Sequence, residues 1–203
     1  MIAWKLKIVF EFPSLKKEVD YLNSNQKKIL HEAIIQFNSQ GVNFKLDDIA
    51  SALKMSKKTL YKYYESKEAL LSAIIDSLFA EIKRKEHEVY EDHSLSNVER
   101  LISLLAVYPD FEVFNYHQIP ALKKVYPDLY ERVDQHLESN WDETFSLLSI
   151  CIASGEIKPI EPHIFKILFL GLYKQLLLEE SHEPEKLMRT CIETIIYGMI
   201  QNH

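Results

Sequence analysis

Apolar residues recur at helical spacing along most of this chain, and this periodicity restricts the possible fold more than any other feature of the sequence. Ile29, Ala33 and Phe37 are spaced four residues apart, and a longer stripe runs from Leu70 to Ile82. Residues three or four apart lie on one face of an α-helix, so both segments are predicted to be amphipathic helices. Only 4 Gly and 7 Pro occur among 203 residues, which favours long helices over turn-rich β structure. The sequence therefore predicts an all-α fold.

The positions of proline, glycine and capping residues divide the helical pattern into segments. Helices are expected over about 25–40, 46–54, 57–64 and 66–90, and then over 96–107, 110–117, 119–125, 127–153, 162–180 and 185–202. Ser56 and Ser66 are predicted N-caps, because a serine hydroxyl accepts a hydrogen bond from a backbone N–H of the first turn. Residues 1–12 alternate like a β-strand without a partner strand, and we interpret them as an arm or as the result of a start site placed too early.

Several classes of protein are disfavoured by the composition. No apolar run reaches about 18 residues without a charge, and residues 1–12 lack the pattern of a secretory signal, so we expect a soluble, cytoplasmic protein that does not bind membranes. Cys151 and Cys191 lie in apolar runs and are expected to be buried, reduced thiols. The 8 His residues include no pair at i, i+4, and no phosphate-binding loop or nucleophile elbow occurs, so no metal, no cofactor and no enzymatic activity are expected.

Positive charge is concentrated near the N-terminus, although the whole chain carries a net charge of −6. Residues 24–75 contain 8 Lys and 5 acidic residues, whereas residues 76–203 contain 12 basic and 22 acidic residues. A local excess of lysine on an otherwise acidic protein is typical of a nucleic-acid-binding patch.

Two short helices separated by a tight turn are predicted within this basic region. The first has an apolar stripe from Leu46 to Leu53 at positions i, i+3, i+4 and i+7. The second begins after the break at Met55 and Ser56. Two helices joined in this way are typical of a helix-turn-helix, whose second helix enters the major groove of DNA. We therefore predict that the region binds DNA.

The outward face of the second helix has the side chains that such a contact requires. Leu60 and Tyr64 are one turn apart and are expected to face the core, so that Lys58 and Lys62 point away from it. Lysine reaches phosphates or guanine acceptors, and Thr and Tyr hydroxyls reach the DNA backbone or base edges. The alternatives are that this face is a solvated lysine-rich surface, or that it binds an acidic partner protein.

A run of about twenty residues from Asp47 carries the most specific pattern in the chain. The pattern consists of Asp47-Asp48-Ile49-Ala50, Met55-Ser56-Lys57-Lys58-Thr59-Leu60-Tyr61-Lys62-Tyr63-Tyr64 and Ser66-Lys67-Glu68, with Ile29, Ala33, Phe37 and Gly41 in the preceding helix. Together these residues resemble the DNA-binding signature of the tetracycline-repressor (TetR) family. The resemblance covers about residues 25–72.

The resemblance implies which residues lie beside DNA. These are Lys45, Ser56, Lys57, Lys58, Thr59, Tyr61, Lys62, Tyr63 and Lys67. Three positions depart from the family's usual pattern. Lys54 stands where Gly is frequent in the turn, Lys58 replaces a small residue, and Lys45 stands where a Thr usually caps the helix.

The resemblance also implies the organisation of the whole chain. A three-helix DNA-binding domain over 24–70 follows the arm at 1–23, and a helical domain over 71–203 binds a small-molecule effector and dimerises through its last two helices. The implied function is that of a ligand-responsive transcriptional repressor, which binds a palindromic operator in double-stranded DNA as a homodimer. The alternative is a helical small-molecule-binding protein or enzyme with a basic surface helix and no operator.

The middle of the chain is rich in aromatic residues, which is typical of an apolar ligand pocket. The candidate lining residues are Phe79, Tyr108, Phe111, Phe114, His117, Tyr130, Trp141 and Phe145. The alternative is an ordinary helical core with partly exposed tyrosines.

Both C-terminal segments, 162–180 and 185–202, are apolar on more than one face. A helix with two apolar faces needs a second packing partner, so we predict a two-fold dimer through a four-helix bundle. The expected interface residues are Phe165, Leu168, Leu172, Met188, Ile192, Ile195 and Met199, and Gly171 and Gly198 are expected to let helices approach closely. The alternative is a fully buried central helix in a monomer.

Overall fold

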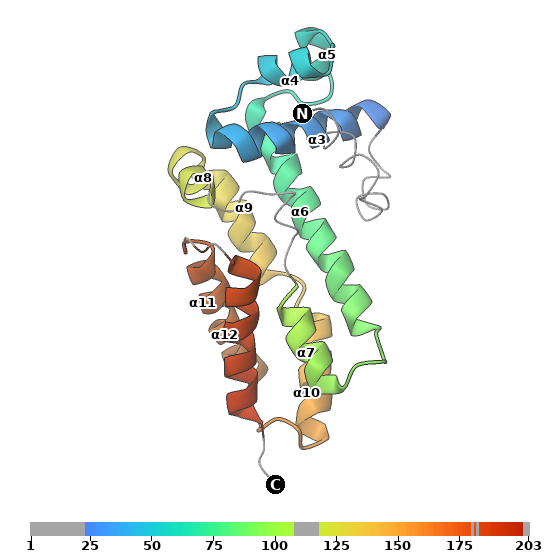
Figure 1. Cartoon of the computed structure of the whole chain (residues 1–203), viewed down its shortest axis with the longest axis vertical. Coiled ribbons are helices and arrows are strands. Elements are labelled where there is room, and N and C mark those ends of the chain that lie inside the picture. The colour runs from blue at the N-terminus through green and yellow to red at the C-terminus, as the bar shows by residue number, and fades with distance from the viewer. Residues whose placement is uncertain (1–22, 108–117, 180, 182, 201–203) are drawn as a thin grey trace.

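The structure is a computed structural model that describes residues 23–107, 118–179, 181 and 183–200, and these residues form an elongated bundle of helices (Figure 1). Among them, the one β-type pairing is an isolated bridge between Ile157 and Ile200. The predicted all-α fold is therefore confirmed. The predicted arm at 1–12 and the predicted helix at 110–117 lie outside the described residues.

The N-terminal half forms one end of the bundle. Its elements are α3 (Ser24–Gln40), the 3₁₀-helix η2 (Gly41–Asn43), α4 (Leu46–Ala52), α5 (Lys57–Tyr61) and α6 (Lys67–Tyr90). In Figure 1, α4 and α5 lie at the top of the molecule, α3 crosses beneath them, and the long α6 descends from this end into the other half. The helix α6 therefore connects the two ends of the molecule.

The C-terminal half completes the bundle. Its helices are α7 (Asn97–Leu105), α8 (Ile119–Val125), α9 (Pro127–Glu138), α10 (Asp142–Ala153), α11 (Pro162–Leu176) and α12 (Pro184–Met199). The single helix predicted over 127–153 is wrong, because the chain breaks between α9 and α10, where Asn140 has a φ of 57°. Asparagine adopts this left-handed conformation more readily than most residues, and the conformation ends a right-handed helix.

Side-chain caps fix where several of these helices begin. Ser56 Oγ accepts from the N–H of Thr59 (3.1 Å), and Ser66 Oγ accepts from the N–H of Ala69 (3.0 Å), which confirms both predicted caps. Lys45 precedes α4 without a side-chain cap, as its replacement of a capping residue suggests. Two N-caps outside the helix-turn-helix, Asn23 and Ser96, form full capping boxes with the residue three positions later.

The buried side chains form two separate clusters, which we call the first and the second core. The first core contains the apolar faces of α3, α4, α5 and the first half of α6, together with Ile119, Leu122, Tyr130 and Val133 from α8 and α9. The second core is built from α7, α10, α11 and α12. The sequence-based boundary at residue 70 falls within α6, whose buried residues from Leu70 to Phe79 all belong to the first core.

The burial of the two cysteines and the length of the helices were also predicted from the sequence. Cys151 is buried as predicted, and burial raises the pKa of its thiol to about 11. Cys191 is only partly buried, which differs from the expectation. Among the described residues, every helix is too short or too polar to cross a lipid bilayer.

Candidate nucleic-acid interface and internal cavity

The turn between α4 and α5 contains a strained backbone position. Lys54 has a φ of 52°, and the N–H of Met55 bonds back to the carbonyl of Ala50 at 2.9 Å. A residue with a Cβ atom adopts this left-handed conformation at a cost, whereas glycine does not. The geometry therefore gives a physical reason why glycine suits the turn position that Lys54 occupies.

The inner face of α5 is fixed by burial. Leu60 and Tyr64 expose only 1% and 6% of their surface, as predicted, and both belong to the first core. The regular helix ends at Tyr61 rather than near residue 64, and the N–H groups of Tyr63 and Tyr64 both bond to the carbonyl of Leu60. The N-cap at Ser56 and this tightened last turn hold α5 rigidly against the core.

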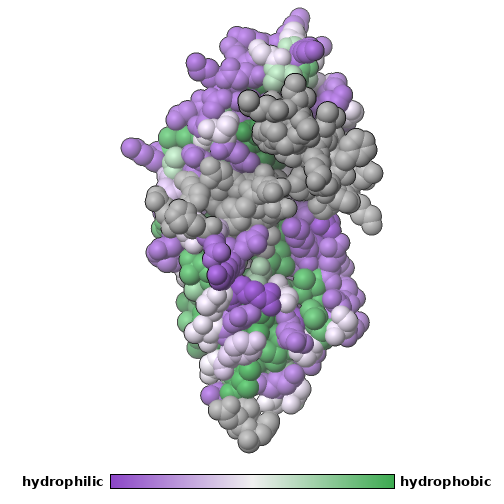
Figure 2. Space-filling model, viewed as in Figure 1, coloured by the Kyte–Doolittle hydropathy of each residue, from purple (hydrophilic) through white to green (hydrophobic). Residues whose placement is uncertain are grey.

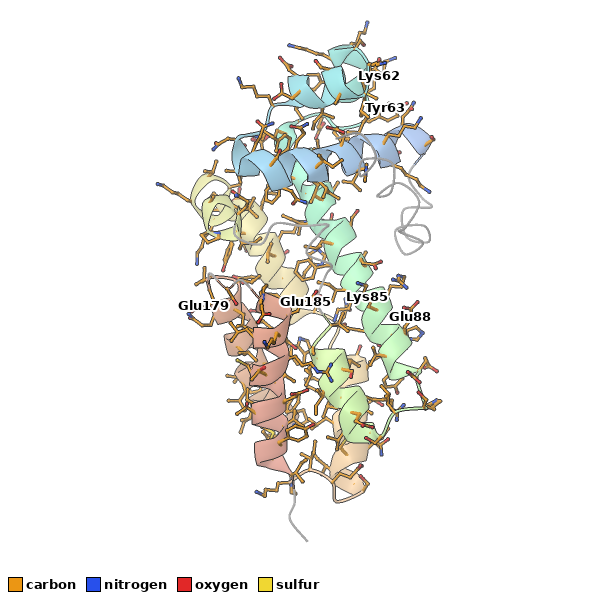
Figure 3. The ribbon with its side chains drawn as sticks, viewed as in Figure 1. Lys62, Tyr63, Lys85, Glu88, Glu179 and Glu185 are labelled. Atoms are coloured by element: carbon orange, nitrogen blue, oxygen red, sulfur yellow. The ribbon has the colours of Figure 1, made fainter. Side chains whose placement is uncertain are left out.

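The outer face of α5 is polar and exposed. Lys58, Tyr61 and Lys62 are exposed, and 48% of the Tyr61 surface is accessible. Thr59 is half-buried, and its hydroxyl lies 2.9 Å from that of Ser56. Figure 2 shows that mostly hydrophilic side chains cover this end of the molecule, and Figure 3 places Lys62 on it.

Lys57 and Tyr63, two of the predicted DNA-side residues, bind side chains of other helices. Lys57 forms an ion pair with Asp47 (2.6 Å), and this hydrogen bond raises the pKa of Lys57. The hydroxyl of Tyr63 accepts a hydrogen bond from Asn25 at 2.9 Å.

Lys67 is drawn furthest into the protein of these residues. Its ammonium group donates to the carbonyl of Val42 (2.5 Å) and lies 4.6 Å from the centre of the Phe44 ring. Burial lowers the pKa of Lys67. Lys67 thus connects the start of α6 to the segment after α3. Lys45, which is also predicted to lie beside DNA, is exposed immediately before α4.

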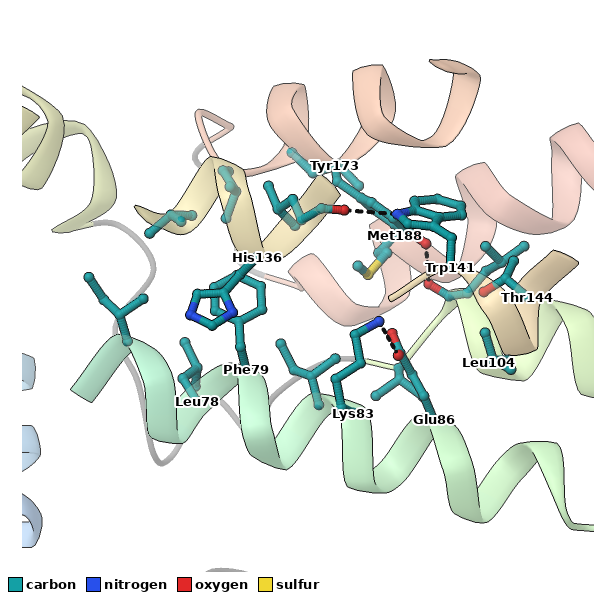
Figure 4. Close-up of a pocket in the computed structure, with 18 of the residues that line it drawn as sticks. Leu78, Phe79, Lys83, Glu86, Leu104, His136, Trp141, Thr144, Tyr173 and Met188 are labelled. Atoms are coloured by element: carbon teal, nitrogen blue, oxygen red, sulfur yellow. Dashed lines mark hydrogen bonds and ion pairs between the residues drawn. The ribbon is translucent and has the colours of Figure 1, made fainter. Parts of the chain in front are cut away.

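A cavity of about 100 Å³ lies between the two cores (Figure 4). Ile75, Phe79 and Val133 of the first core form one side of its wall, and Leu104, Trp141 and Met188 of the second core form the other. Four polar side chains, Lys83, Glu86, His136 and Thr144, also border it. The cavity therefore touches both cores and the helix α6 that connects them.

The predicted pocket residues are only partly found at this cavity. Phe79 and Trp141 line it, whereas Tyr130 is buried in the first core and Phe145 packs against Trp141 with ring centres 5.9 Å apart. Tyr130 and Phe145 therefore do not line this cavity, and their role in ligand binding stays a prediction. The other four candidates, Tyr108, Phe111, Phe114 and His117, lie outside the described residues.

The polar residues of the cavity wall could not be recognised from the sequence. Lys83 and Glu86 are three positions apart on α6 and read as an ordinary surface pair, yet their groups meet at 2.6 Å beside the cavity. Lys83 also donates to the carbonyl of Asn140 at 3.0 Å. Burial raises the pKa of Glu86 despite the neighbouring ammonium group.

Aromatic groups in the wall are also hydrogen-bonded within the chain. Trp141 donates its indole N–H to the carbonyl of Leu137 at 2.9 Å, and the hydroxyl of Tyr173 donates to the carbonyl of Leu105 at 2.8 Å. Burial raises the pKa of Tyr173, so that its hydroxyl stays protonated.

A charged cluster joins α6 to α9 beside the cavity. Arg132 holds both carboxylate oxygens of Asp76 at 2.7 Å, and Nε2 of His136 lies 2.9 Å from the same carboxylate. The His136 ring stacks on Phe79 with centres 4.6 Å apart. Burial raises the pKa of Asp76, but the hydrogen bonds from Arg132 and His136 lower it by more, so the pKa lies below its usual value.

The predicted dimer residues fall into two groups. Phe165, Ile192 and Met188 are buried in the second core of a single chain and expose 0%, 0% and 8% of their surface, so they are not available to a partner. Their prediction as interface residues was wrong. Leu168 is exposed, and Leu172, Ile195 and Met199 are half-buried.

Three further apolar residues on α11 and α12, which were not among the predicted interface residues, are exposed. Ile164, Ile167 and Tyr197 each expose more than half of their surface. A Cβ atom added at Gly171 or Gly198 would meet no atom of this chain within 4 Å. The outward face of α11 therefore runs through Ile164, Ile167, Leu168 and Gly171, at the i, i+3, i+4, i+7 spacing of one helix face.

The cluster around Asp76 predicts a pH-dependent contribution to stability. The Asp76→Asn variant should lower the free energy of unfolding at pH 7 by about 1 kcal/mol, because a partly exposed ion pair contributes little more than this. A carboxylate with a depressed pKa stabilises the fold above its unfolded pKa of about 3.9 and stops doing so as the pH falls through its lower native value. The difference between the two proteins should therefore shrink below about pH 4.

Urea denaturation at several pH values measures this difference. Glu131→Gln, an exposed carboxylate on the same helix as Arg132, is the matched control and should change stability little at any pH. A deficit of Asp76→Asn that stays the same from pH 7 to pH 3.5 would contradict the role assigned to the cluster.

Comparison with known proteins identifies the family. The family described as "Bacterial regulatory proteins, tetR family" matches residues 29–74. The HTH-type transcriptional regulator YvaF of Bacillus subtilis is 32% identical over 160 residues, which cover 78% of this chain and 82% of that protein. A second B. subtilis regulator of this type, YhgD, is 26% identical over 173 residues, which cover 80% of this chain and 89% of that protein.

Solved structures share the fold along nearly the whole chain. A TetR/AcrR-family regulator from Thermobifida fusca superposes with a TM-score of 0.70 at 21% identity, covering 87% of this chain and 98% of that one. A TetR regulator from Haloarcula marismortui gives a TM-score of 0.69 at 17% identity, covering 88% and 100%. The chain belongs to the TetR family of helix-turn-helix transcriptional regulators, and it is a DNA-binding regulator of transcription.

Proposed function

We propose that this regulator is a ligand-responsive repressor, which binds a palindromic operator as a homodimer and reads it with α5. The observation that carries the proposal is the division of α5 into two faces. Leu60 is buried to 1% exposure, whereas Lys58 and Lys62 are exposed on the same short helix. A helix held this way presents cationic and hydroxyl groups to the major groove without having to unpack from its core.

The predicted DNA-side residues take different roles in this proposal. Lys58, Tyr61 and Lys62 are exposed on α5 and are assigned to base edges and phosphates. Lys45 and Lys57 lie at the N-terminal ends of α4 and α5, where backbone N–H groups also favour a phosphate.

Four remaining candidates act mainly by supporting this surface. Ser56 caps α5 and Thr59 lies against the cap, while Tyr63 and Lys67 hold α3 and η2 in place through Asn25 and Val42. We assign these four residues to positioning the reading helix.

Reversal of one exposed charge tests the reading face. Lys58→Glu should lower the affinity for an operator selected from random DNA by at least tenfold, because it removes a phosphate-range cation and adds a repulsive charge. With Lys45, Lys57, Lys58 and Lys62 contributed by each of two chains, wild-type binding should show a log–log salt slope of about −5 to −7 if most of them engage. The slope should become less steep in Lys58→Glu.

The matched control is Lys158→Glu, an exposed lysine before α11 at the opposite end of the molecule. Fluorescence anisotropy with labelled operator gives both affinities, and circular dichroism checks that the fold persists. If Lys58→Glu binds the selected operator as tightly as wild type, α5 is not the reading helix.

The proposed dimer uses the outward faces of α11 and α12, since family members bind operator DNA as dimers. Exposed apolar residues scattered singly are normal on a protein surface, but a continuous patch marks an interaction site. Ile164, Ile167 and Leu168 form such a row on α11, and Tyr197 is exposed on α12. A two-fold dimer that binds a palindromic operator must place its two reading heads about 34–36 Å apart, which is the spacing of one DNA turn.

A charge placed in this face should dissociate the dimer. Wild type should sediment at twice the chain mass of 23.9 kDa at micromolar concentration, and Leu168→Glu should shift toward the monomer, because an unpaired carboxylate would be buried in the interface. Ile150→Glu is the control, since Ile150 is similarly exposed at 41% but lies on α10. A wild-type chain that sediments as a monomer would remove the dimer from the proposal.

The proposed response to a ligand runs through α6. The cavity borders Ile75, Phe79 and Ile82 on this helix, and the Asp76 cluster ties the same stretch to α9. In this proposal the cavity ligand and the operator favour different arrangements of α6. Ligand binding then changes the affinity for DNA, and DNA binding changes the affinity for the ligand by the same factor.

This response predicts a measurable coupling between ligand and operator. A cavity ligand found by thermal-shift screening should change operator affinity about 5- to 150-fold, corresponding to about 1–3 kcal/mol. The Asp76→Asn variant should reduce that factor, since it loosens the link between α6 and α9. The measurement is an operator titration with and without saturating ligand; a ligand that binds the cavity and leaves operator affinity unchanged would count against the response.

A further inference from the structure

We propose that the cavity takes a small, uncharged and mainly apolar molecule about the size of one aromatic ring. This inference rests on the proposed function, in which the cavity is the effector site, and it names the class of effector. It is based on two observations. Most polar groups of the cavity wall already have partners within the chain, and the rest of the wall is apolar and encloses a small volume.

Five side chains of the wall that carry polar groups are already paired within the chain. Lys83 binds Glu86 and the carbonyl of Asn140, and His136 lies against Asp76. Trp141 and Tyr173 each donate to a backbone carbonyl. Among the described residues, the buried side-chain atoms without a hydrogen bond belong to Tyr64, Arg100 and Asp134, which do not border the cavity, and that of Asp134 still pairs with Lys174 at 3.4 Å. The wall therefore presents no orphaned buried group that a ligand would be needed to satisfy.

A charged ligand would have to disrupt one of these pairs. An anion would compete for Lys83 and leave the buried carboxylate of Glu86 without its counter-ion. A cation would approach Glu86 against the repulsion of Lys83, whose ammonium group lies 2.6 Å from that carboxylate. Separating this partly buried pair is unfavourable, because the Glu86 carboxylate, of whose side chain 18% is exposed, would lose its counter-ion in a position that water reaches poorly. An apolar molecule requires no such exchange.

The rest of the wall suits an apolar ring. Phe79, Trp141 and Tyr173 offer aromatic surfaces, and Leu104, Ile82 and Met188 surround them with aliphatic ones. Apolar cavities of this order of size stay dry and bind small hydrocarbons. The hydroxyl of Thr144 is the remaining polar group at the wall, and it can form a hydrogen bond with one polar substituent of the ligand. A volume of about 100 Å³ limits the ligand to roughly one ring.

A set of three probes of one size tests the charge preference. Toluene, benzylamine and benzoate are neutral, cationic and anionic at pH 7, and each contains a single ring. Isothermal titration of the full chain should show toluene binding at least tenfold more tightly than either ion, and thermal unfolding should shift upward with toluene alone.

Cavity variants then locate the bound toluene. Leu176→Phe and Leu104→Phe each add a ring to the wall and should lower toluene affinity at least tenfold; two positions are used in case one variant fails to fold. Ile150→Phe makes the same kind of change on the exposed face of α10 and should leave the affinity unchanged.

Each contrary result overturns the inference in a defined way. Benzylamine binding that exceeds toluene binding and is lost in Glu86→Gln would make the site cationic. Benzoate binding that exceeds toluene binding and is lost in Lys83→Met would make it anionic. Failure of all three probes, or toluene binding that the filling variants leave unchanged, would also overturn it.

Operator binding measured on the same samples separates this inference from the proposed function. If DNA binds normally and toluene does not, only the ligand class fails. If toluene binds the cavity and Lys58→Glu leaves operator affinity unchanged, only the assignment of α5 fails.

Discussion

Burial of one face of α6 is the interaction on which the rest of the structure depends. Leu70, Leu71, Ile74 and Ile75 expose no more than 3% of their surface, and Phe79 exposes 8%. Full burial of each such side chain contributes about 1.5–3 kcal/mol, and truncation of one to alanine typically costs about 2–5 kcal/mol. The helix α3, on which α4 packs, contacts one part of α6, and α9 contacts another, so the loss of these contacts would release both from a common support.

The helix-turn-helix could be predicted almost completely from the sequence, because local rules determine it. A serine cap, an apolar stripe and one pair of inward residues are enough to orient α5, and Ser56, Leu60 and Tyr64 all behave as these rules require. The exceptions are residues whose side chains reach elsewhere in the chain. Lys67 carries a charge and is near the DNA-binding region, but its ammonium group turns inward to the carbonyl of Val42, 25 positions away in sequence.

The cavity and the dimer face could be predicted only in outline, because periodicity reports that a helix face is apolar and does not report what covers it. On α11, Phe165 and Phe169 face the second core while Ile164 and Ile167 face outward, and all four are equally apolar in sequence. Lys83 and Glu86 show the converse problem. Their i, i+3 spacing fits a solvated surface, and the cavity exists beside them only because α10 and α11 close over that part of α6 from distant points in the chain.

The arrangement of α6 also has a mechanical consequence. From Glu86 at the cavity to Lys67 at the helix-turn-helix, this helix acts as a lever arm roughly 28 Å long, at 1.5 Å per residue. A tilt of about 5° at the cavity end would displace the other end by roughly 2–3 Å. A hydrogen bond between a side chain and a base edge fails over a smaller distance than this. In the proposed response, a ligand the size of a single ring would therefore need to tilt α6 by only a few degrees to displace a reading head that it does not contact.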